Sequence, residues 1–152
     1  ITTNCSNNFG PFQNKEKLIP KIIDKIMKNK KIPVYGNGLN QRDWIFVNDH
    51  VKILYSLSKR GIVGETYNIG TKNVVSNLKI IDELLKIYNS KFNKKKTLED
   101  VIKFVEDRKG HDFRYAINNL KINKLLKLKK KKTFKKNLRQ TFDWYLENYK
   151  KK

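Results

Sequence analysis

The sequence predicts an α/β fold, and two features of its pattern lead to that prediction. Short runs rich in β-branched and aromatic residues alternate along the chain with longer segments whose apolar residues recur at helical spacing. Residues 1–5 are the first such run, and they pass into the turn-forming sequence SNNFGPF. A length of 152 residues suits one domain with appended elements.

The first half of the chain predicts two helices and two further strands. The apolar residues of the first helix are Leu18, Ile19, Ile22, Ile23, Ile26 and Met27. Pro20 falls in its first turn, where the missing N–H costs little. The runs KIPVYG and RDWIFV predict strands on either side of the turn NGLNQ. Asn48 is expected to cap the next helix, with Asp49 in the first turn.

The second half continues the alternation. ETYNIG predicts a strand that ends at glycine, and Asn77 is expected to cap the helix that follows. NSKFNKKK is expected to be a solvated loop, and VIKFVED a strand. A short helix is predicted around Leu120 to Leu126, followed by the lysine-rich link KLKKKKT. The apolar residues of the last predicted helix are Phe134, Leu138, Phe142, Tyr145 and Tyr149.

The formal net charge of +21 raises the possibility of a polyanionic partner such as nucleic acid. Only five of the 35 basic residues are arginine, however, and the arginine side chain is the one suited to specific phosphate or base recognition. The lysines are also mixed with asparagine and isoleucine along the whole chain. A basic nucleic-acid-binding module is therefore kept only as an alternative, and specific nucleic-acid binding is not expected.

Cysteine and histidine are too scarce for several kinds of site. A single cysteine, Cys5, excludes an intramolecular disulfide and fits a reducing compartment, so a cytoplasmic location is expected. Cys5, His50 and His111 do not make a zinc-binding set. No apolar run approaches the ~20 residues that a membrane span needs, and no membrane partner is expected. The abrupt start at Ile1 leads us to expect a piece of a longer protein.

Two patterns resemble dehydrogenase motifs, and both have simpler explanations. Gly36 and Gly38 have the G-x-G spacing, but Gln41 stands where a third glycine is required, so we interpret YGNGLNQ as a turn. Tyr55 and Lys59 have the Tyr-x-x-x-Lys spacing of short-chain dehydrogenases. Such pairs arise by chance in a lysine-rich chain, and we expect Tyr55 to be a packed aromatic residue beside the apolar face.

Two groups of charges are candidates for anion binding. Arg42 is either half of a surface ion pair with Asp43 or a ligand for a diphosphate, and the sequence leaves this open. In the segment DRKGHDFRYAI, residues 107–117, Arg108 follows a predicted strand and Gly110 permits a sharp turn. His111 and Arg114 would share a face if that turn winds into a helix. Neutralisation by Asp107 and Asp112 is the alternative, but anion binding is favoured.

Five motifs, in order and with similar spacing, strongly resemble the C-terminal half of dTDP-glucose 4,6-dehydratase. They are TNCSNNFGPF…EKLIPKII, PVYGNGLNQRDWIFVNDH, GETYNIG, NLKIID and DRKGHDFRYAI. That family belongs to the extended short-chain dehydrogenases and acts on a nucleotide sugar. The resemblance implies that residues 1–14 are a residual Rossmann strand and a substrate-site turn. Residues 15–152 would then form a nucleotide-sugar-binding α/β domain with returning Rossmann elements.

The resemblance also implies roles for residues in its first two motifs. Asn7 would contact the phosphates of the substrate, and Asn8 would lie on the nicotinamide side, as the one cofactor-binding residue. Lys17 and Leu18 would border the nucleotide. The nucleobase pocket would be lined by Pro33, Val34 and Tyr35.

The later motifs are implied to hold the remainder of the nucleotide. Arg42 would meet the diphosphate, and Asn77 would hydrogen-bond the nucleotide. Three residues of the segment DRKGHDFRYAI would close over the diphosphate and ribose: Asp107, Arg108 and His111. Arg42, Arg108 and His111 are also the candidates for anion binding that the residue types and their positions indicate.

The family's reaction is an internal oxidation, elimination and reduction carried out by bound NAD. Its Tyr-x-x-x-Lys pair, threonine, Asp-Glu pair and glycine-rich loop all lie upstream of the NCSNN segment, so no catalytic residue is assigned in this chain. The expected partners are a nucleotide sugar and either the N-terminal half or a second copy of the chain. Another NAD-dependent nucleotide-sugar epimerase or decarboxylase remains the alternative within the class.

Overall fold

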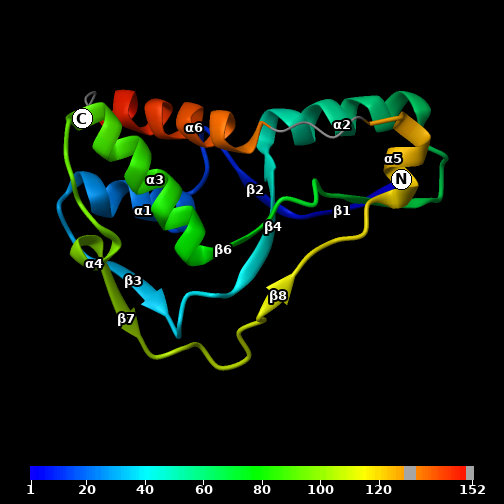
Figure 1. The fold of residues 1–152 in the computed structure, drawn as a ribbon. Coiled ribbons are helices and arrows are strands. Elements are labelled where there is room, and N and C mark those ends of the chain that lie inside the picture. The colour runs from blue at the N-terminus through cyan, green and yellow to red at the C-terminus, as the bar shows by residue number, and fades with distance from the viewer. Residues whose placement is uncertain (129–132, 150–152) are drawn as a thin grey trace.

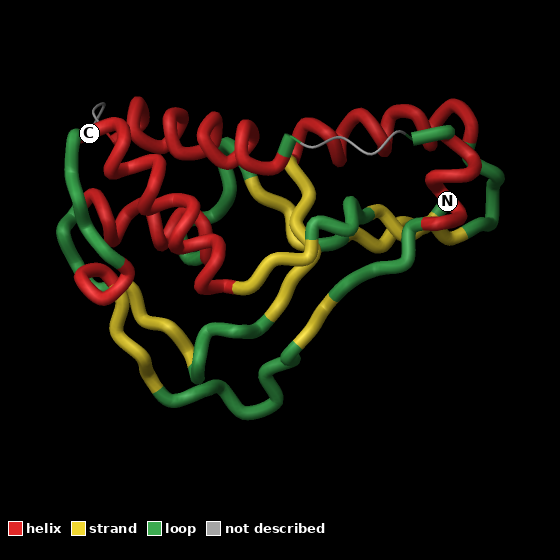
Figure 2. Tube along the Cα trace, viewed as in Figure 1, coloured by secondary structure: helices red, strands yellow, loops and turns green. Residues whose placement is uncertain are grey.

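The computed structural model describes residues 1–128 and 133–149, and it has the predicted α/β architecture with mostly parallel strand pairs. The helices that begin at Val47 and Phe134 lie along the upper edge of the molecule in Figure 1, and most strands and loops lie below them. In the tube view of Figure 2, the yellow strands form three separate groups rather than one continuous sheet. No described helix is long and apolar enough to cross a membrane.

The N-terminal segment contributes to two sheets in turn. β1 (Thr2–Cys5) pairs in parallel with β5 (Thr66–Ile69). After Ser6 the chain enters β2 (Asn7–Phe9), which pairs in parallel with β4 (Gln41–Phe46). Among the described strands β1 pairs only with β5, and all four of its residues are exposed, so one edge of this strand is open.

The remaining strands surround β4 or form a separate pair. β6 (Val74–Ser76) lies antiparallel to β4, and the two-residue β8 (Arg114–Tyr115) lies parallel to it. Neither short strand was predicted, because two or three residues carry no usable periodicity. β3 (Ile32–Tyr35) and β7 (Ile102–Val105) pair in parallel, away from the other strands (Figure 1).

Two hydrophobic clusters hold these elements together. The larger one lies among α1 (Leu18–Met27), α3 (Asn77–Phe92) and α6 (Phe134–Tyr149), and it includes the buried residues Phe9 and Trp44 of the β2–β4 pair. The smaller one lies among β5 and two helices. These helices are α2 (Val47–Arg60) and α5 (Leu120–Leu126).

Two predicted helix caps were wrong by one or two residues. Strand β4 runs directly into α2 at Val47, so Asn48 lies inside the helix and no side chain caps it. At α3 the cap is Ser76, whose hydroxyl accepts a hydrogen bond from the Lys79 N–H. Asn77 is instead the first helical residue, and its own N–H donates to the Asn40 carbonyl at 3.1 Å.

Two predicted boundaries also moved. α3 continues through Phe92, so the first half of NSKFNKKK is helical, and the helix ends at Asn93 in the left-handed conformation (φ 49°). The segment before β7 contains a short helix, α4 (Leu98–Val101), whose capping box is formed by Thr97 and Asp100. Most of the predicted lysine-rich link, at 129–132, lies outside the described residues.

Two expectations about single residues were wrong. Tyr55 is 68% exposed, with the Lys59 ammonium 5.7 Å from its ring centre, so it is not a packed aromatic residue. The turn at Gly110 does not wind into a helix. Arg114 instead lies in strand β8 and is exposed, since pairing with β4 extends the backbone there.

Candidate functional site

The carboxyl ends of β3 and β7 bring the strongest group of predicted residues together. These strands are parallel neighbours, with Tyr35 opposite Val105 at their ends. Parallel strands end at the same edge of a sheet, so the loop after β7 begins beside Tyr35. The Arg108 guanidinium lies over the Tyr35 ring, 5.0 Å from its centre, in the geometry of a cation–π contact.

His111 joins the acidic and the basic residue of this loop. Its Nδ1 lies 2.7 Å from an Asp107 carboxylate oxygen, and its Nε2 lies 3.1 Å from Arg108 Nη2. A guanidinium can only donate, so Nε2 must accept and the ring proton resides on Nδ1, which donates to Asp107. The imidazole is therefore neutral in this arrangement. Its side chain is 6% exposed, whereas that of Asp107 is 43% exposed.

The hydrogen bond from His111 lowers the pKa of Asp107, and the bond from the Arg108 backbone N–H, 2.8 Å long, acts in the same direction. Gly36 makes the close approach of this carboxylate possible. Its φ is +56°, and a Cβ there would come within 2.8 Å of an Asp107 carboxylate oxygen. A loop, a turn and two strand ends thus form one cluster, which we call the Tyr35–His111 cluster: Tyr35, Asp107, Arg108 and His111.

The other two residues of the predicted nucleobase pocket differ in accessibility. Val34 is 3% exposed and packs in the larger hydrophobic cluster, so its side chain is not available to line a base pocket. Pro33 and Tyr35 are half-buried and alternate with it along β3, which places them on the opposite face. Only these two side chains of the predicted three are on an open face.

Arg42 does not form the surface ion pair that was one of its two interpretations. Its neighbour Asp43 is fully buried and accepts hydrogen bonds from the Thr71 N–H and hydroxyl, at 3.1 and 3.0 Å. Arg42 donates to the Gln41 carbonyl at 2.7 Å, and no described carboxylate forms an ion pair with it. The guanidinium is half-buried and retains free donors.

Asn77 and the amino end of α1 occupy separate places in the fold. Asn77 begins α3, next to the turn that carries Gly38, whose carbonyl accepts the Leu78 N–H at 3.1 Å. Lys17 stands at the amino end of α1 and is exposed, and Leu18 is half-buried against the larger cluster. Among the described residues, no hydrogen bond or ion pair joins Lys17 or Asn77 to the Tyr35–His111 cluster.

Asn7 and Asn8 lie on β2 and differ in the hydrogen bonds of their side chains. Asn8 is held by several hydrogen bonds, one of which comes from His50 at 2.8 Å. The side chain of Asn7 shares no hydrogen bond with any described residue. No pattern in the sequence distinguishes these two adjacent asparagines.

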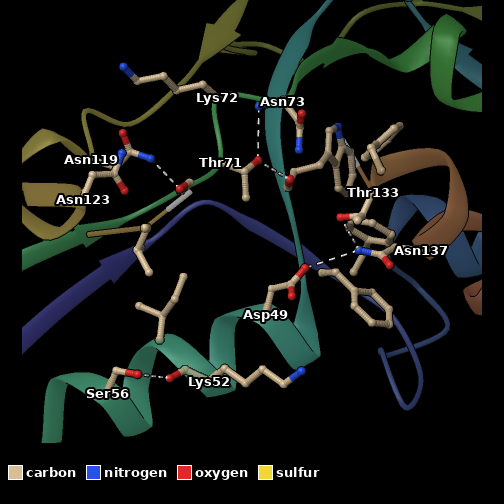
Figure 3. Close-up of a pocket in the computed structure, with 17 residues that line it drawn as sticks. Asp49, Lys52, Ser56, Thr71, Lys72, Asn73, Asn119, Asn123, Thr133 and Asn137 are labelled. Carbon is tan, nitrogen blue, oxygen red and sulfur yellow. Dashed lines mark hydrogen bonds between the residues drawn. The ribbon is translucent and has the colours of Figure 1, made fainter. Parts of the chain in front are cut away.

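A pocket of about 370 Å³ lies elsewhere, between α2, the loop after β5, α5 and the start of α6 (Figure 3). Asp49 accepts a hydrogen bond from Asn137 at 3.3 Å on one wall, and Asn119 donates to the Gly70 carbonyl at 2.6 Å on another. None of the predicted site residues lines it. Its walls come from segments far apart in the sequence, so no local motif could have indicated it.

The described residues do not offer a binding loop for a dinucleotide. The turn with Gly36 and Gly38 leads into strand β4, not into a helix whose amino end could face a pyrophosphate. The described part of the chain also contains no group of three or more His, Cys, Asp or Glu side chains placed to hold a metal ion.

Solved structures with this arrangement are nucleotide-sugar dehydratases and epimerases. A Bacillus anthracis dTDP-glucose 4,6-dehydratase in complex with NAD matches with a TM-score of 0.85 and 40% identity, over 97% of this chain and 44% of that one. A Bacillus cereus UDP-glucuronic acid 4-epimerase shares the fold, with a TM-score of 0.84 at 23% identity, over 97% of this chain and 45% of that one. The chain therefore has the fold of the corresponding part of these proteins.

The chain belongs to the family described as GDP-mannose 4,6 dehydratase, whose model matches residues 1–141. It is 44% identical to a dTDP-glucose 4,6-dehydratase of Neisseria meningitidis, over 97% of this chain and 43% of that protein. It is 43% identical to dTDP-glucose 4,6-dehydratase 1 of Escherichia coli, over 99% of this chain and 42% of that protein. The predicted resemblance is confirmed, and the chain spans less than half the length of these relatives.

Proposed function

We propose that this chain binds dTDP-glucose, as the substrate-binding part of an NAD-dependent dTDP-glucose 4,6-dehydratase. The observation that carries the proposal is the Tyr35–His111 cluster, which places an aromatic ring, an arginine and a histidine at one pair of strand ends. An aromatic face suits a nucleobase, and a guanidinium suits a diphosphate. The names of the relatives favour dTDP-glucose as the particular ligand.

Two more positive or donating groups support diphosphate binding. Arg42 has free guanidinium donors, and Asn77 opens the 16-residue helix α3, whose amino end favours negative charge. In our proposal Arg42 and Arg108 hold the diphosphate, and Asn77 hydrogen-bonds the nucleotide. Pro33 and Tyr35 border the base, while Lys17 and Leu18 border the nucleotide from the amino end of α1.

The ligand-free cluster is closed on itself, which constrains how a nucleotide enters. Arg108 covers one face of the Tyr35 ring and donates to His111 at the same time. A base that stacks on that face must displace the guanidinium. Arg108 would then be free to reach the diphosphate, so binding of the two parts of the ligand is coupled in this proposal.

We further propose that the 152 residues alone neither bind NAD nor turn over substrate. The NAD-driven chemistry needs a dinucleotide loop and proton-transfer groups, and the turn with Gly36 and Gly38 leads into strand β4 rather than into a helix. Tyr55 and Lys59 have the right spacing but lie exposed on α2. Formation of dTDP-4-keto-6-deoxyglucose by the purified chain would refute this part of the proposal.

Calorimetric titration with dTDP tests the binding proposal. We expect dTDP to bind more tightly than UDP or pyrophosphate, and Arg108→Ala to weaken dTDP binding roughly tenfold, as loss of a charge-assisted contact does. A preference for UDP would favour an epimerase or decarboxylase. Steeply salt-dependent DNA binding, with no preference for dTDP over phosphate, would favour the nucleic-acid alternative.

A further inference from the structure

The side chain of Asn8 is fully engaged inside the protein. Its Nδ2 donates to the Ser6 carbonyl at 3.2 Å and to Cys5 Sγ at 3.3 Å, and its Oδ1 lies 2.8 Å from His50 Nδ1. A carbonyl can only accept, so the amide nitrogen must face Ser6 and the amide oxygen must face His50. No donor of this amide is left over for a ligand.

The same contact fixes the state of His50. The amide oxygen of Asn8 only accepts, so His50 must carry a proton on Nδ1. His50 Nε2 is buried and has no hydrogen-bond partner among the described residues. A second proton there would have no acceptor, and burial accordingly lowers the pKa of His50. Burial therefore favours the neutral ring, whose Nδ1–H donates to Asn8.

This bond ties β2 to α2 at the point where the chain changes sheets. Ser6 still donates its N–H to Ile69 of β5 at 2.9 Å, and Asn8 is already paired with Ile45 of β4. The backbone carbonyl of Asn8 also accepts from Gln13 Nε2 at 2.7 Å. Asn8 therefore contributes to the orientation of β2 beside the pairing with β4, and its side chain is bonded to the first turn of α2.

The hydrogen bond between His50 and Asn8 also determines where the side chain of Asn7 points. Successive side chains of a strand point to opposite faces, so fixing Asn8 toward α2 turns Asn7 away from it. Asn7 is half-buried and shares no side-chain hydrogen bond with a described residue, which leaves its amide free for a ligand. The side chain of Asn8 is therefore bonded within the protein, whereas that of Asn7 is available to a ligand.

We propose that His50 is a positioning residue for the nucleotide site: it clamps Asn8 and thereby aims Asn7 at the phosphates. The inference rests on the proposed function, in which Asn7 contacts the substrate phosphates. It also assigns Asn8 a supporting role through its side chain, in place of a direct side-chain contact with the nicotinamide.

The ligand-free clamp is tested first, by long-range ¹H–¹⁵N spectra of the histidine rings. The ring signals of His50 are identified by their loss in His50→Asn. We expect a neutral ring protonated on Nδ1. A ring protonated on Nε2 would overturn the proposal, because that tautomer cannot donate to Asn8.

The functional test measures dTDP affinity by calorimetry in two matched variants. His50→Leu keeps the bulk of the ring and removes the donor, and we expect it to bind dTDP roughly fivefold more weakly, as loss of one neutral hydrogen bond does. His50→Asn keeps a donor near the position of Nδ1, and we expect it to stay within about twofold of the parent chain. Val51→Ala, an exposed neighbour on α2, is the control variant. Circular dichroism verifies that each variant is folded.

A double-mutant cycle separates positioning from general damage. If His50 acts through Asn7, the Leu substitution should change dTDP affinity by less than about twofold in an Asn7→Ala background. An equal loss in both backgrounds, or no loss in either, would overturn the inference and leave the proposed function intact. A parent chain that binds no dTDP would overturn the proposed function, and the role of His50 with it.

Discussion

At the scale of single residues, the chain from Asp107 through His111 to Arg108 explains how this loop holds an arginine without neutralising it. The carboxylate is bonded to the imidazole and not to the guanidinium, and no described ion pair joins Asp107 to Arg108. His111 therefore bridges the Asp107 carboxylate and the Arg108 guanidinium and holds the guanidinium in place. Neutralisation by the acidic residues was the alternative interpretation of this segment. Asp107 forms no ion pair with the Arg108 guanidinium among the described residues, although the arginine charge helps to lower the pKa of Asp107.

The first prediction concerns the carboxylate of Asp107. His111→Ala should raise the pKa of Asp107 toward its ordinary value, because the hydrogen bond from His111 is the largest cause that lowers it. Carboxyl ¹³C NMR titration measures this directly. Asp100, whose pKa is lowered by hydrogen bonds from Thr97, is an internal control that should not move. An unchanged titration of Asp107 would contradict the hydrogen-bond assignment.

At the scale of elements, capping and strand pairing decide where α3 begins. Ser76 ends β6 and also caps α3, so one residue serves a sheet and a helix. Asn77 was chosen from the sequence because asparagine also favours caps. Strand β4 decides between Ser76 and Asn77, because its Gln41 pairs with Ser76 and makes Ser76 the last extended residue of β6.

The second prediction follows from that corrected cap. Ser76→Ala should lower the free energy of unfolding by about 1 kcal/mol, the usual cost of a lost side-chain cap. Ser90→Ala, an exposed position late in the same helix, is the matched control and should have little effect. Chemical denaturation measures both. A larger loss for Asn77→Ala than for Ser76→Ala would show that the cap is misassigned.

At the scale of the whole molecule, α6 joins the end of the chain to its beginning. Tyr145 packs in the larger hydrophobic cluster and donates its hydroxyl proton to the Gln13 carbonyl. Gln13 in turn donates to the Asn8 carbonyl, so α6 supports the turn after β2. Strand β2 and the turn after it are thus bonded to α2 through His50 and to α6 through Tyr145.

The third prediction uses the tyrosine at this junction. Burial raises the pKa of Tyr145 to about 12, above the ordinary value of 10.0. The unfolded chain therefore loses this proton first, and the stability that Tyr145 contributes is complete below pH 10 and declines as the pH rises toward 12. Tyr145→Phe should remove the part of the decline in the free energy of unfolding that comes from this hydroxyl. The difference between parent and variant in urea denaturation from pH 9 to pH 12 measures it, and parallel curves would contradict the burial of this hydroxyl.

The sequence by itself determined the α/β class, the positions of the long helices and the family. Helical periodicity and turn residues are local signals, and the matching motifs extend along the whole chain. Tertiary structure alone decided that Val34 faces the core and that Asn8 is clamped while Asn7 is free. It also decided that His111 connects Asp107 with Arg108. These outcomes depend on strand pairing and on helix placement between segments far apart in the chain, and no local spacing encodes them.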